Sequence, residues 1–397
     1  MKVKSILNTK VFIAILKKIQ VGSLKVTLPD GRVYLFEGPL KGNHGELVIN
    51  DTKAITKILK SSDIGLAEAY RDNLIDSPDM TSLLLLCIEN QNALINLFKG
   101  HFLVMIYFRV KHLFRSNTKK NSRKNIQAHY DLGNSFYKLW LDPTMTYSSA
   151  LFSSEKDSLE QAQKNKYQRI IDTLKPNSSD HILEVGCGWG GFAVLVAKQT
   201  GCKVTCLTLS LEQHKYALEV VKQMELEHLI DVKVCDYRDE KGIYDYVVSI
   251  EMIEAVGEEY WGDYFSMINE KLKPGGKAMI QSIYMVDELF DNYRKSTDFI
   301  QQYIFPGGMV LAPKIFDKFS LKYNLEINDF FKFGPDYART LNLWRSEFKK
   351  RYEQVRKIGF DEPFLKIWDF YYVYCEAGFI SRRIDVAQIV FEKKSEG

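Results

Sequence analysis

The sequence predicts an α/β fold over its C-terminal two thirds and a smaller α+β domain before it. Three observations predict this arrangement. Strand and helix patterns alternate from about residue 160, a glycine-rich turn joins the first of these strands to its helix, and residues 20–50 carry short alternating runs separated by turn residues. Repeated strand–helix units imply a parallel sheet covered by helices on both faces. A protein of 397 residues accommodates two or three domains of ordinary size.

The composition is typical of a folded protein and argues against several classes. Hydrophobic residues make up 46% and charged residues 26% of the sequence, which excludes wholesale disorder. No run approaches the roughly 20 apolar residues of a membrane span. Lysines interrupt the first 20 residues too often for a signal peptide. The six cysteines form no Cys-x-x-Cys pair, so we expect reduced thiols and a cytoplasmic protein.

Positive charge is concentrated in the first third of the sequence. Residues 1–125 contain 20 basic and 10 acidic residues, and no acidic residue lies between Glu89 and Asp131. This basic segment is interleaved with apolar and aromatic residues, which favours contact with an anionic membrane surface. Nucleic acid is the competing polyanion, but no nucleic-acid-binding module is evident. The plainer alternative is an ordinary helix followed by a solvated basic linker.

The N-terminal elements begin with three expected strands. They are VGSLKVTL at 21–28, RVYLFEG at 32–38 and GELVIN at 45–50, and the turn Pro29–Gly31 predicts a hairpin between the first two. Helical periodicity follows at about 52–61 and 81–98. The polar, basic residues 116–125 are expected to link an N-terminal domain, 1–115, to a catalytic domain, 126–397.

The C-terminal elements follow from period and turn residues. Strands are expected at 181–187, 203–210, 232–238, 244–252, 277–285 and 386–393, and helices at about 190–201, 211–225 and 260–272. An aromatic helical insert is expected at about 286–325 and a long helical segment at 336–382.

The glycine-rich turn predicts a cofactor site. E-V-G-C-G-W-G-G at 184–191 joins a buried strand to a helix, where glycines permit close backbone approach and the helix start favours negative charge. No acidic residue ends the second strand at 207–210, which disfavours NAD. With D-Y-R at 236–238 and K-P-G-G at 273–276, the turn resembles the first motif of class I S-adenosylmethionine methyltransferases, whose sheet is Rossmann-like.

A further series of segments narrows the resemblance. It comprises HYDLGN at 129–134, MTYS at 145–148, GCGWGG at 186–191, LTLSLEQ at 207–213, MIEAVG at 252–257, YIFPGG at 303–308, FGPDY at 333–337 and YYVYCEAGF at 371–379. In this order they resemble the cyclopropane-fatty-acyl-phospholipid synthase family, relatives of the mycolic acid cyclopropane synthases. Residues 65–70 and 76–78 are similar to the family's lipid-side domain.

The resemblance implies a reaction and a set of site residues. The family transfers a methylene from S-adenosylmethionine to the cis double bond of an unsaturated phospholipid acyl chain, through a carbocation that bound bicarbonate deprotonates. The implied catalytic residues are Glu254, Tyr337, Ser149, Gln281 and Ile283, with Cys375 matching the cysteine often treated as an active-site thiol. The implied cofactor-binding residues are Tyr147, Ser148, Gly186, Cys187, Gly188, Gly190, Thr208, Gln213, Tyr237 and Arg238, to which the methyltransferase pattern adds Asp236 beside the adenine.

The resemblance also implies a homodimer. From the basic N-terminal segment we expect the protein to lie peripherally at the inner face of the membrane. We expect no metal, because His129 and His214 lack partners at metal-ligand spacing. A cysteine among aromatic residues at helical spacing is more often part of the core, so Cys375 has that alternative.

Three positions depart from the family pattern. Ser149 stands where many members have cysteine, Gln281 where many have histidine, and Ala255, not histidine, follows Glu254. Gln281 donates a hydrogen bond but does not carry a proton, which affects the proton-removal step. Y-S-S-A at 147–150 also resembles relatives that methylate the alkene without ring closure. The alternatives are therefore a C-methyltransferase of acyl chains that gives a methylene or methyl branch, a lipid-binding protein without catalysis, and a small-molecule N- or O-methyltransferase.

Overall fold

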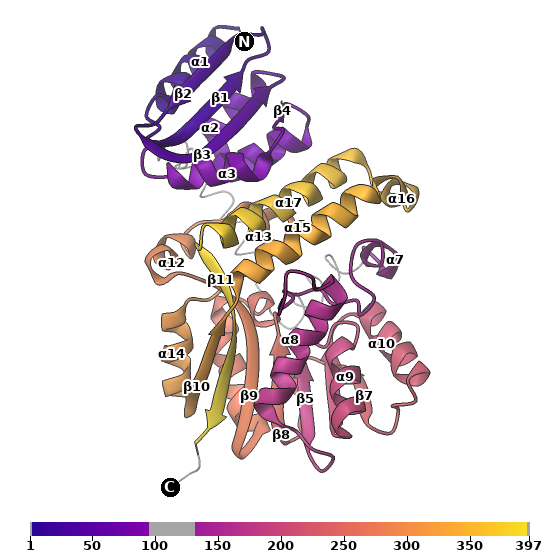
Figure 1. Ribbon diagram of the computed structural model, residues 1–397. Coiled ribbons are helices and arrows are strands. Elements are labelled where there is room, and N and C mark those ends of the chain that lie inside the picture. Colours follow the sequence, from indigo (N-terminus) through magenta and orange to yellow (C-terminus); the bar gives the residue numbers. More distant parts are fainter. Residues whose placement is uncertain (1, 95–131, 395–397) are drawn as a thin grey trace. The chain divides into compact units, whose positions relative to one another are not determined.

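The computed structural model describes residues 2–94 and 132–394, and the protein forms two compact units (Figure 1). The first unit comprises Met1–Phe114, Tyr293–Pro306 and Lys349–Ser381, and the second comprises Arg115–Asn292, Gly307–Phe348 and Arg382–Gly397. The first unit thus includes two segments that the sequence analysis assigned to the catalytic domain. The predicted linker, 116–125, and most of the basic segment lie outside the described residues.

The first unit is built on a four-stranded sheet with the order β2-β1-β3-β4. Its strands are β1 (Val21–Thr27), β2 (Val33–Glu37), β3 (Leu40–Ile49) and β4 (Ile75–Asp76), and its helices are α1 (Lys2–Leu16), α2 (Lys53–Arg71), α3 (Met80–Glu89), α13 (Phe299–Tyr303), α16 (Tyr352–Lys357) and α17 (Glu362–Ile380). The predicted hairpin is present, because β1 and β2 pair antiparallel. Helix α17 packs against α2 and α3, which explains why this late segment belongs to the N-terminal unit.

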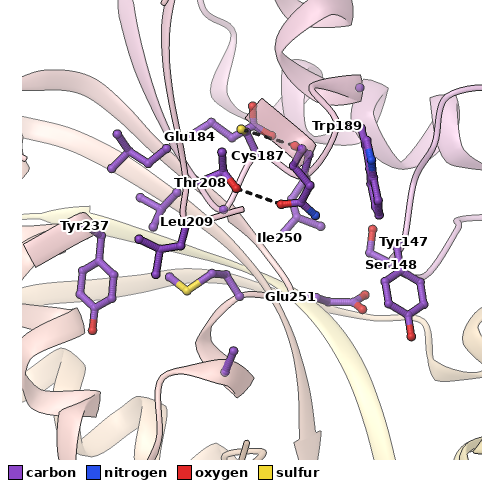
Figure 2. A pocket seen from close by; sticks show the side chains of 18 of the residues that line it. Tyr147, Ser148, Glu184, Cys187, Trp189, Thr208, Leu209, Tyr237, Ile250 and Glu251 are labelled. Carbon is purple, nitrogen blue, oxygen red and sulfur yellow. Dashed lines mark hydrogen bonds between the residues drawn. The ribbon is translucent and has the colours of Figure 1, made fainter. Parts of the chain in front are cut away.

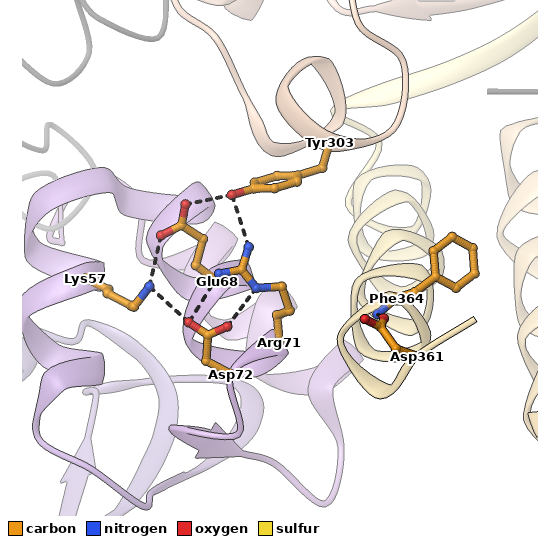
Figure 3. Close-up of polar contacts among 7 residues, drawn as sticks. All are labelled: Lys57, Glu68, Arg71, Asp72, Tyr303, Asp361 and Phe364. Atoms are coloured by element: carbon orange, nitrogen blue, oxygen red, sulfur yellow. Dashed lines mark hydrogen bonds and ion pairs between the residues drawn. The ribbon is translucent and has the colours of Figure 1, made fainter. Parts of the chain in front are cut away.

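Polar contacts hold the late segments of this unit to α2 (Figure 3). The Tyr303 hydroxyl on α13 donates to Glu68 Oε1 at 2.7 Å. Lys57 bridges Glu68 and Asp72, and Arg71 pairs with Asp72. Helix α17 begins at the N-cap Asp361, whose carboxylate accepts from the Phe364 N–H. Buried contacts add to these, since the Tyr70 hydroxyl donates to Asp369 and the Tyr374 hydroxyl donates to Asp63.

The second unit contains a seven-stranded sheet with the order β10-β11-β9-β8-β5-β6-β7. The strands are β5 (His181–Val185), β6 (Lys203–Thr208), β7 (Ile230–Val234), β8 (Tyr244–Ile250), β9 (Leu272–Met285), β10 (Leu325–Lys332) and β11 (Ile384–Lys393). Strands β5 to β9 are parallel, as predicted, but β11 pairs antiparallel with both β9 and β10, so the sheet is mixed. Strand β10 was not predicted, because its half-exposed residues at the sheet edge lack a clear alternation.

Helices cover both faces of this sheet. Those packed on its strands are α8 (Leu159–Leu174), α9 (Gly191–Thr200), α10 (Leu211–Gln223), α11 (Trp261–Lys271) and α14 (Pro313–Lys322). This unit also contains α7 (Asn134–Tyr137), α12 (Asp287–Tyr293) and α15 (Gly334–Lys350). Helices α8, α9 and α10 share one core cluster that includes Val390 of β11. The next residue, Phe391, points to the other face and contacts Phe265 of α11, which stacks on Phe319 of α14. In the described part of the protein, no helix is long and apolar enough to cross a membrane.

The strand order creates a switch point between β5 and β8. From β5 the backbone proceeds outward to β6 and β7, then returns to β8 on the other side of β5. Helices that follow strands on either side of such a point cover opposite faces, which leaves a crevice at the carboxyl ends of the strands. The glycine-rich turn follows β5, and Glu251 follows β8, so both lie at this crevice.

Candidate active site

The glycine-rich turn after β5 has backbone conformations that favour glycine. Gly186, Gly188 and Gly190 have φ angles of 80°, 54° and 89°, all in the left-handed region. A Cβ at Gly186 would lie 2.7 Å from Met252 Cγ, whereas a Cβ at Gly188 would meet no atom within 4 Å. Gly190 is the N-cap of α9. The turn therefore presents open backbone to a ligand at a helix start.

One pocket contains most of the predicted cofactor-binding residues. It holds about 1120 Å³ of empty space, including open solvent at its mouth. Ten of the eleven predicted cofactor-binding residues line it, and the remaining one, Gly190, caps the adjacent helix. Figure 2 shows Tyr237 at one side of the pocket and Tyr147 and Ser148 at the other, with Glu251 directed toward the latter pair.

Polar contacts organise the Tyr237 side of the pocket. Arg238 binds the Asp236 carboxylate with two hydrogen bonds, of 2.8 and 2.6 Å. The Tyr237 ring packs edge-on against Tyr264, and its buried hydroxyl has no hydrogen-bond partner among the described residues. Thr208 donates to Gln213 Oε1 at 2.9 Å (Figure 2). The glycine turn, a ring with an unused hydroxyl and these polar groups fit the nucleoside and amino acid ends of S-adenosylmethionine.

A buried lysine lies at the Ser148 side of the pocket. Lys166 of α8 is fully buried and donates to Ser148 Oγ at 2.6 Å. Burial lowers the pKa of this ammonium to about 7, while the nearby Glu251, Asp142 and Glu184 oppose that decrease. Lys166 and these acidic groups therefore form one desolvated network behind the Ser148 side of the pocket.

Glu251 is the acceptor on which the predicted catalytic donors converge. Its Oε1 accepts from the Ser149 N–H and from Gln281 Nε2, both at 2.8 Å, and its Oε2 accepts from the Tyr337 hydroxyl at 2.6 Å. Its backbone φ is 50°, which is unusual for a residue other than glycine. Burial raises the pKa of the Glu251 carboxyl, and the Tyr337 hydroxyl and Lys166 oppose that increase.

Glu254 lies one turn further along the backbone and has fewer donors. Its Oε1 accepts from the Ile283 N–H at 2.5 Å and from the Ser282 hydroxyl at 2.9 Å, while its buried Oε2 has no partner within residues 2–94 and 132–394. Burial, followed by the negative charge of Glu251, raises the pKa of Glu254 to about 8. Five of the six predicted catalytic residues thus belong to one network around two carboxyl groups.

Cys375 is the predicted catalytic residue that this network does not include. It lies on α17, in the first unit, where burial raises the pKa of its thiol. A neutral thiol is a weak nucleophile. His129 lies outside the described residues, and His214 Nε2 contacts the Val232 carbonyl. Within the described residues, no group of three or more His, Cys, Asp or Glu side chains is placed to hold a metal ion.

Comparison with known proteins decides the family. The family model described as mycolic acid cyclopropane synthetase matches residues 117–389. The chain belongs to this family. Its relatives include the tuberculostearic acid methyltransferase UfaA1 of Mycobacterium tuberculosis, 36% identical over 82% of this chain and 78% of the relative. They also include the cyclopropane-fatty-acyl-phospholipid synthase of Escherichia coli K12, 29% identical over 94% of this chain and 96% of the relative.

A solved structure of the family supports the cofactor. Mycolic acid cyclopropane synthase CmaA1, complexed with S-adenosylhomocysteine and CTAB, superposes with a TM-score of 0.65 at 28% identity, covering 68% of this chain and 98% of that one. The protein is thus an S-adenosylmethionine-dependent methyltransferase of the cyclopropane synthase family that modifies fatty acids.

The sequence patterns did not single out Glu251 or Lys166. Glu251 directly follows the buried strand β8, and an acidic residue at the carboxyl end of a central parallel strand is a signal that could have identified it. Lys166 lies on the buried stripe of α8 with Tyr167 and Ile170. A lysine on an apolar helix face is a similar signal, since buried lysines require a specific partner.

Proposed function

We propose that the protein is a cyclopropane-fatty-acyl-phospholipid synthase, which converts the cis double bond of a membrane phospholipid acyl chain into a cyclopropane ring. The observation that carries this proposal is that a proton-accepting network and a cofactor pocket meet at the same wall. Glu251 and Ser148 line the pocket, and Ser149, Gln281 and Tyr337 donate hydrogen bonds to Glu251.

The chemistry requires an electrophile, protection for a cation and a base. When bound, S-adenosylmethionine supplies an electrophilic methyl group. Methylation of the alkene leaves positive charge on the acyl chain, which the faces of aromatic rings stabilise. Tyr147 at the pocket wall belongs to a cluster with Tyr137, Trp140 and Trp344, at centroid distances of 5.3 to 5.5 Å. A carboxylate at the wall then accepts a proton from the methylated substrate.

Features of the first unit support a phospholipid in a membrane as the substrate. Helix α1 exposes Ile6, Leu7 and Val11, and six lysines and no acidic residue precede Asp30 in the sequence. Exposed apolar side chains among lysines suit contact with an anionic lipid surface. The match to the E. coli phospholipid synthase extends over this unit as well as the catalytic one. We therefore place the protein peripherally at the cytoplasmic face of the membrane.

A second product can arise from the same first step. The higher identity to the tuberculostearic acid methyltransferase, together with Ser149 and Gln281 at two departing positions, favours a methylene- or methyl-branched acyl group as the second candidate. Both routes begin with methylation of the double bond and differ in how the cation is resolved.

Incubation with lipid vesicles and methyl-labelled S-adenosylmethionine tests the proposal. Vesicles of cis-monounsaturated phospholipid are compared with vesicles of the saturated phospholipid, and the acyl chains are released and analysed by mass spectrometry. We expect label only in fatty acids from the unsaturated lipid. Mild hydrogenation distinguishes a ring from a methylene branch of the same mass, because only the branch takes up hydrogen. Absence of label from every fatty acid would refute both products and favour a lipid-binding protein without catalysis.

A further inference from the structure

We propose that the carboxylate of Glu251 is the base that removes the proton from the methylated acyl chain, so that the protein needs no bicarbonate. This inference rests on the proposed function. It assigns the proton-accepting step to a side chain of the protein that lines the cofactor pocket.

The hydrogen-bond donors of the site support this assignment. The resemblance gives bicarbonate as the base, held by groups at Ser149, Gln281, Ile283, Tyr337 and Glu254. In this protein the Ser149 N–H, the Gln281 amide and the Tyr337 hydroxyl all donate to Glu251, and the Ile283 N–H donates to Glu254. A carboxylate and a bicarbonate ion present the same pair of acceptor oxygens on a planar carbon. The donors that would bind the ion thus already bind a side chain with the same acceptor geometry.

The charges around the two carboxyl groups favour Glu251 as the ionised member. The charge of Glu251 raises the pKa of Glu254, and two carboxyl groups that interact in this way share a proton more readily than they ionise together. Three donors and the Lys166 ammonium favour the charged form of Glu251. In the described part of the protein, one buried oxygen of Glu254 has no partner, and the pKa of Glu254 is about 8, so Glu254 holds the proton. Desolvation makes the Glu251 carboxylate a stronger base than an exposed glutamate, which suits proton abstraction near neutral pH.

The step balances without another reactant. The carbon–sulfur bond of the sulfonium breaks as the methyl carbon bonds to one alkene carbon, which leaves a cation at the other. Glu251 takes a proton from the new methyl group, and the electron pair of that C–H bond closes the ring onto the cationic carbon. For a methylene branch, a hydride shift first moves the cation to the carbon that bears the new methyl group. Loss of a proton from that methyl group then leaves the C–H electron pair to form the C=CH2 double bond of the branch. Glu251 releases its proton to solvent before the next turnover.

The substitution Glu251→Gly tests the proposal because it opens space for the missing ion. Glycine tolerates the left-handed backbone at this position, so the variant removes the carboxylate without adding backbone strain. The isosteric Glu251→Gln removes the base and keeps the space filled. Glu270→Gln, at an exposed glutamate that accepts from Ser266, is the matched control. S-adenosylhomocysteine binding by calorimetry verifies that each variant retains the pocket.

We expect wild-type activity on vesicles to be the same in carbonate-free buffer and in added bicarbonate. Glu251→Gly and Glu251→Gln should each lose about 100-fold or more, as expected for loss of a general base. Bicarbonate should restore activity to the glycine variant at saturating concentration and leave the glutamine variant inactive, while the control behaves as the wild type. Carbon-13 NMR of labelled bicarbonate should detect binding to the glycine variant and none to the wild type.

These measurements separate the two proposals. A wild type that binds labelled bicarbonate, or that loses activity in carbonate-free buffer, would overturn the role of Glu251 even if it labels the lipid. A Glu251→Gln variant that retains activity and binds S-adenosylhomocysteine would do the same. A wild type that labels no lipid refutes the proposed function. In that case the NMR comparison still tests whether the Glu251 side chain occupies an anion site. Bicarbonate binding to both the wild type and Glu251→Gly would refute that occupancy.

Discussion

The substitution Glu254→Gln tests whether the pKa of Glu254 is raised in the folded protein. Burial, together with the charge of Glu251, raises the pKa of Glu254 from 4.5 to about 8. The folded protein therefore binds this proton more tightly than the unfolded protein does. Between a pH of about 4.5 and about 8, the unfolding free energy of the wild type falls as the pH rises. Glutamine does not titrate, and its Oε1 can still accept from Ile283 and Ser282, so the variant lacks this fall.

The pKa sets the size of the effect. A rise from 4.5 to about 8 corresponds to about 5 kcal/mol at roughly 1.36 kcal/mol per pKa unit. Each kcal/mol changes the melting temperature of a domain of this size by roughly 2–4 °C. Between about pH 5 and about pH 9, the melting temperature of the wild type should thus fall by up to roughly 10–20 °C relative to the variant. Thermal denaturation followed by circular dichroism measures this difference.

Glu240, in the same unit, supplies a control because its pKa is lowered, whereas that of Glu254 is raised. Burial opposes its ionisation, but hydrogen bonds from the Gly242 N–H, the Tyr244 hydroxyl and the Lys241 N–H lower its pKa to about 2. Its stabilising effect is fully present above a pH of about 4.5 and is lost as the pH falls through about 2. Glu240→Gln should therefore lower the melting temperature by a constant amount across the range. If the difference between Glu254→Gln and the wild type is also constant, Glu254 is ionised throughout and the reasoning is wrong.

Two further predictions concern other positions. Gly186→Ala should lower the melting temperature by several degrees more than Gly188→Ala does. Both glycines have positive φ, but only at Gly186 would the added Cβ meet Met252. Equal decreases in the melting temperature of the two variants would contradict this prediction. Burial and Asp63 raise the pKa of Asp298 to about 7. Asp298→Asn should therefore stabilise the first unit by up to about 4 kcal/mol above pH 7 and leave its stability unchanged near pH 4. Denaturant unfolding at both pH values measures this difference, and equal effects at both would refute the prediction.

The fold was predictable where periodicity and turn residues agree. The hairpin at Pro29–Gly31 and the five parallel strands follow from local pattern. Strand β10 was missed because L-E-I-N-D-F-F-K at 325–332 alternates only over its first four residues, before a register shift between Ile327 and Asp329. Amphipathic pattern also does not say which core a helix joins. Helices α13 and α17 lie between catalytic-domain segments in the sequence but pack in the first unit, because their apolar faces meet α2.

The sequence predicted which residues lie at the strand ends of the site, but not which side chains form hydrogen bonds with each other. The resemblance assigned Gly186, Thr208 and Tyr237 to one cofactor site, and the structure places all three in one pocket. The resemblance named Tyr337 and Gln281, but their acceptor depends on side-chain geometry across distant segments. It is Glu251, to which the sequence pattern assigned no role. Hydrogen-bond partners are decided by tertiary packing, which neither spacing nor charge encodes locally.

Glu251 also accounts for two departures from the family pattern. A histidine at position 281 can carry a proton. A residue that only positions the Glu251 carboxylate needs a hydrogen-bond donor and no titratable group. The Gln281 amide N–H is such a donor, and the Gln281 oxygen accepts from Gln388. Position 149 serves Glu251 through its backbone N–H, so the change from cysteine to serine leaves that bond intact. Reversing position 281 alone, in Gln281→His, should therefore not restore a bicarbonate requirement, because Glu251 still fills the site. Only removal of the Glu251 side chain should make the reaction rate depend on bicarbonate.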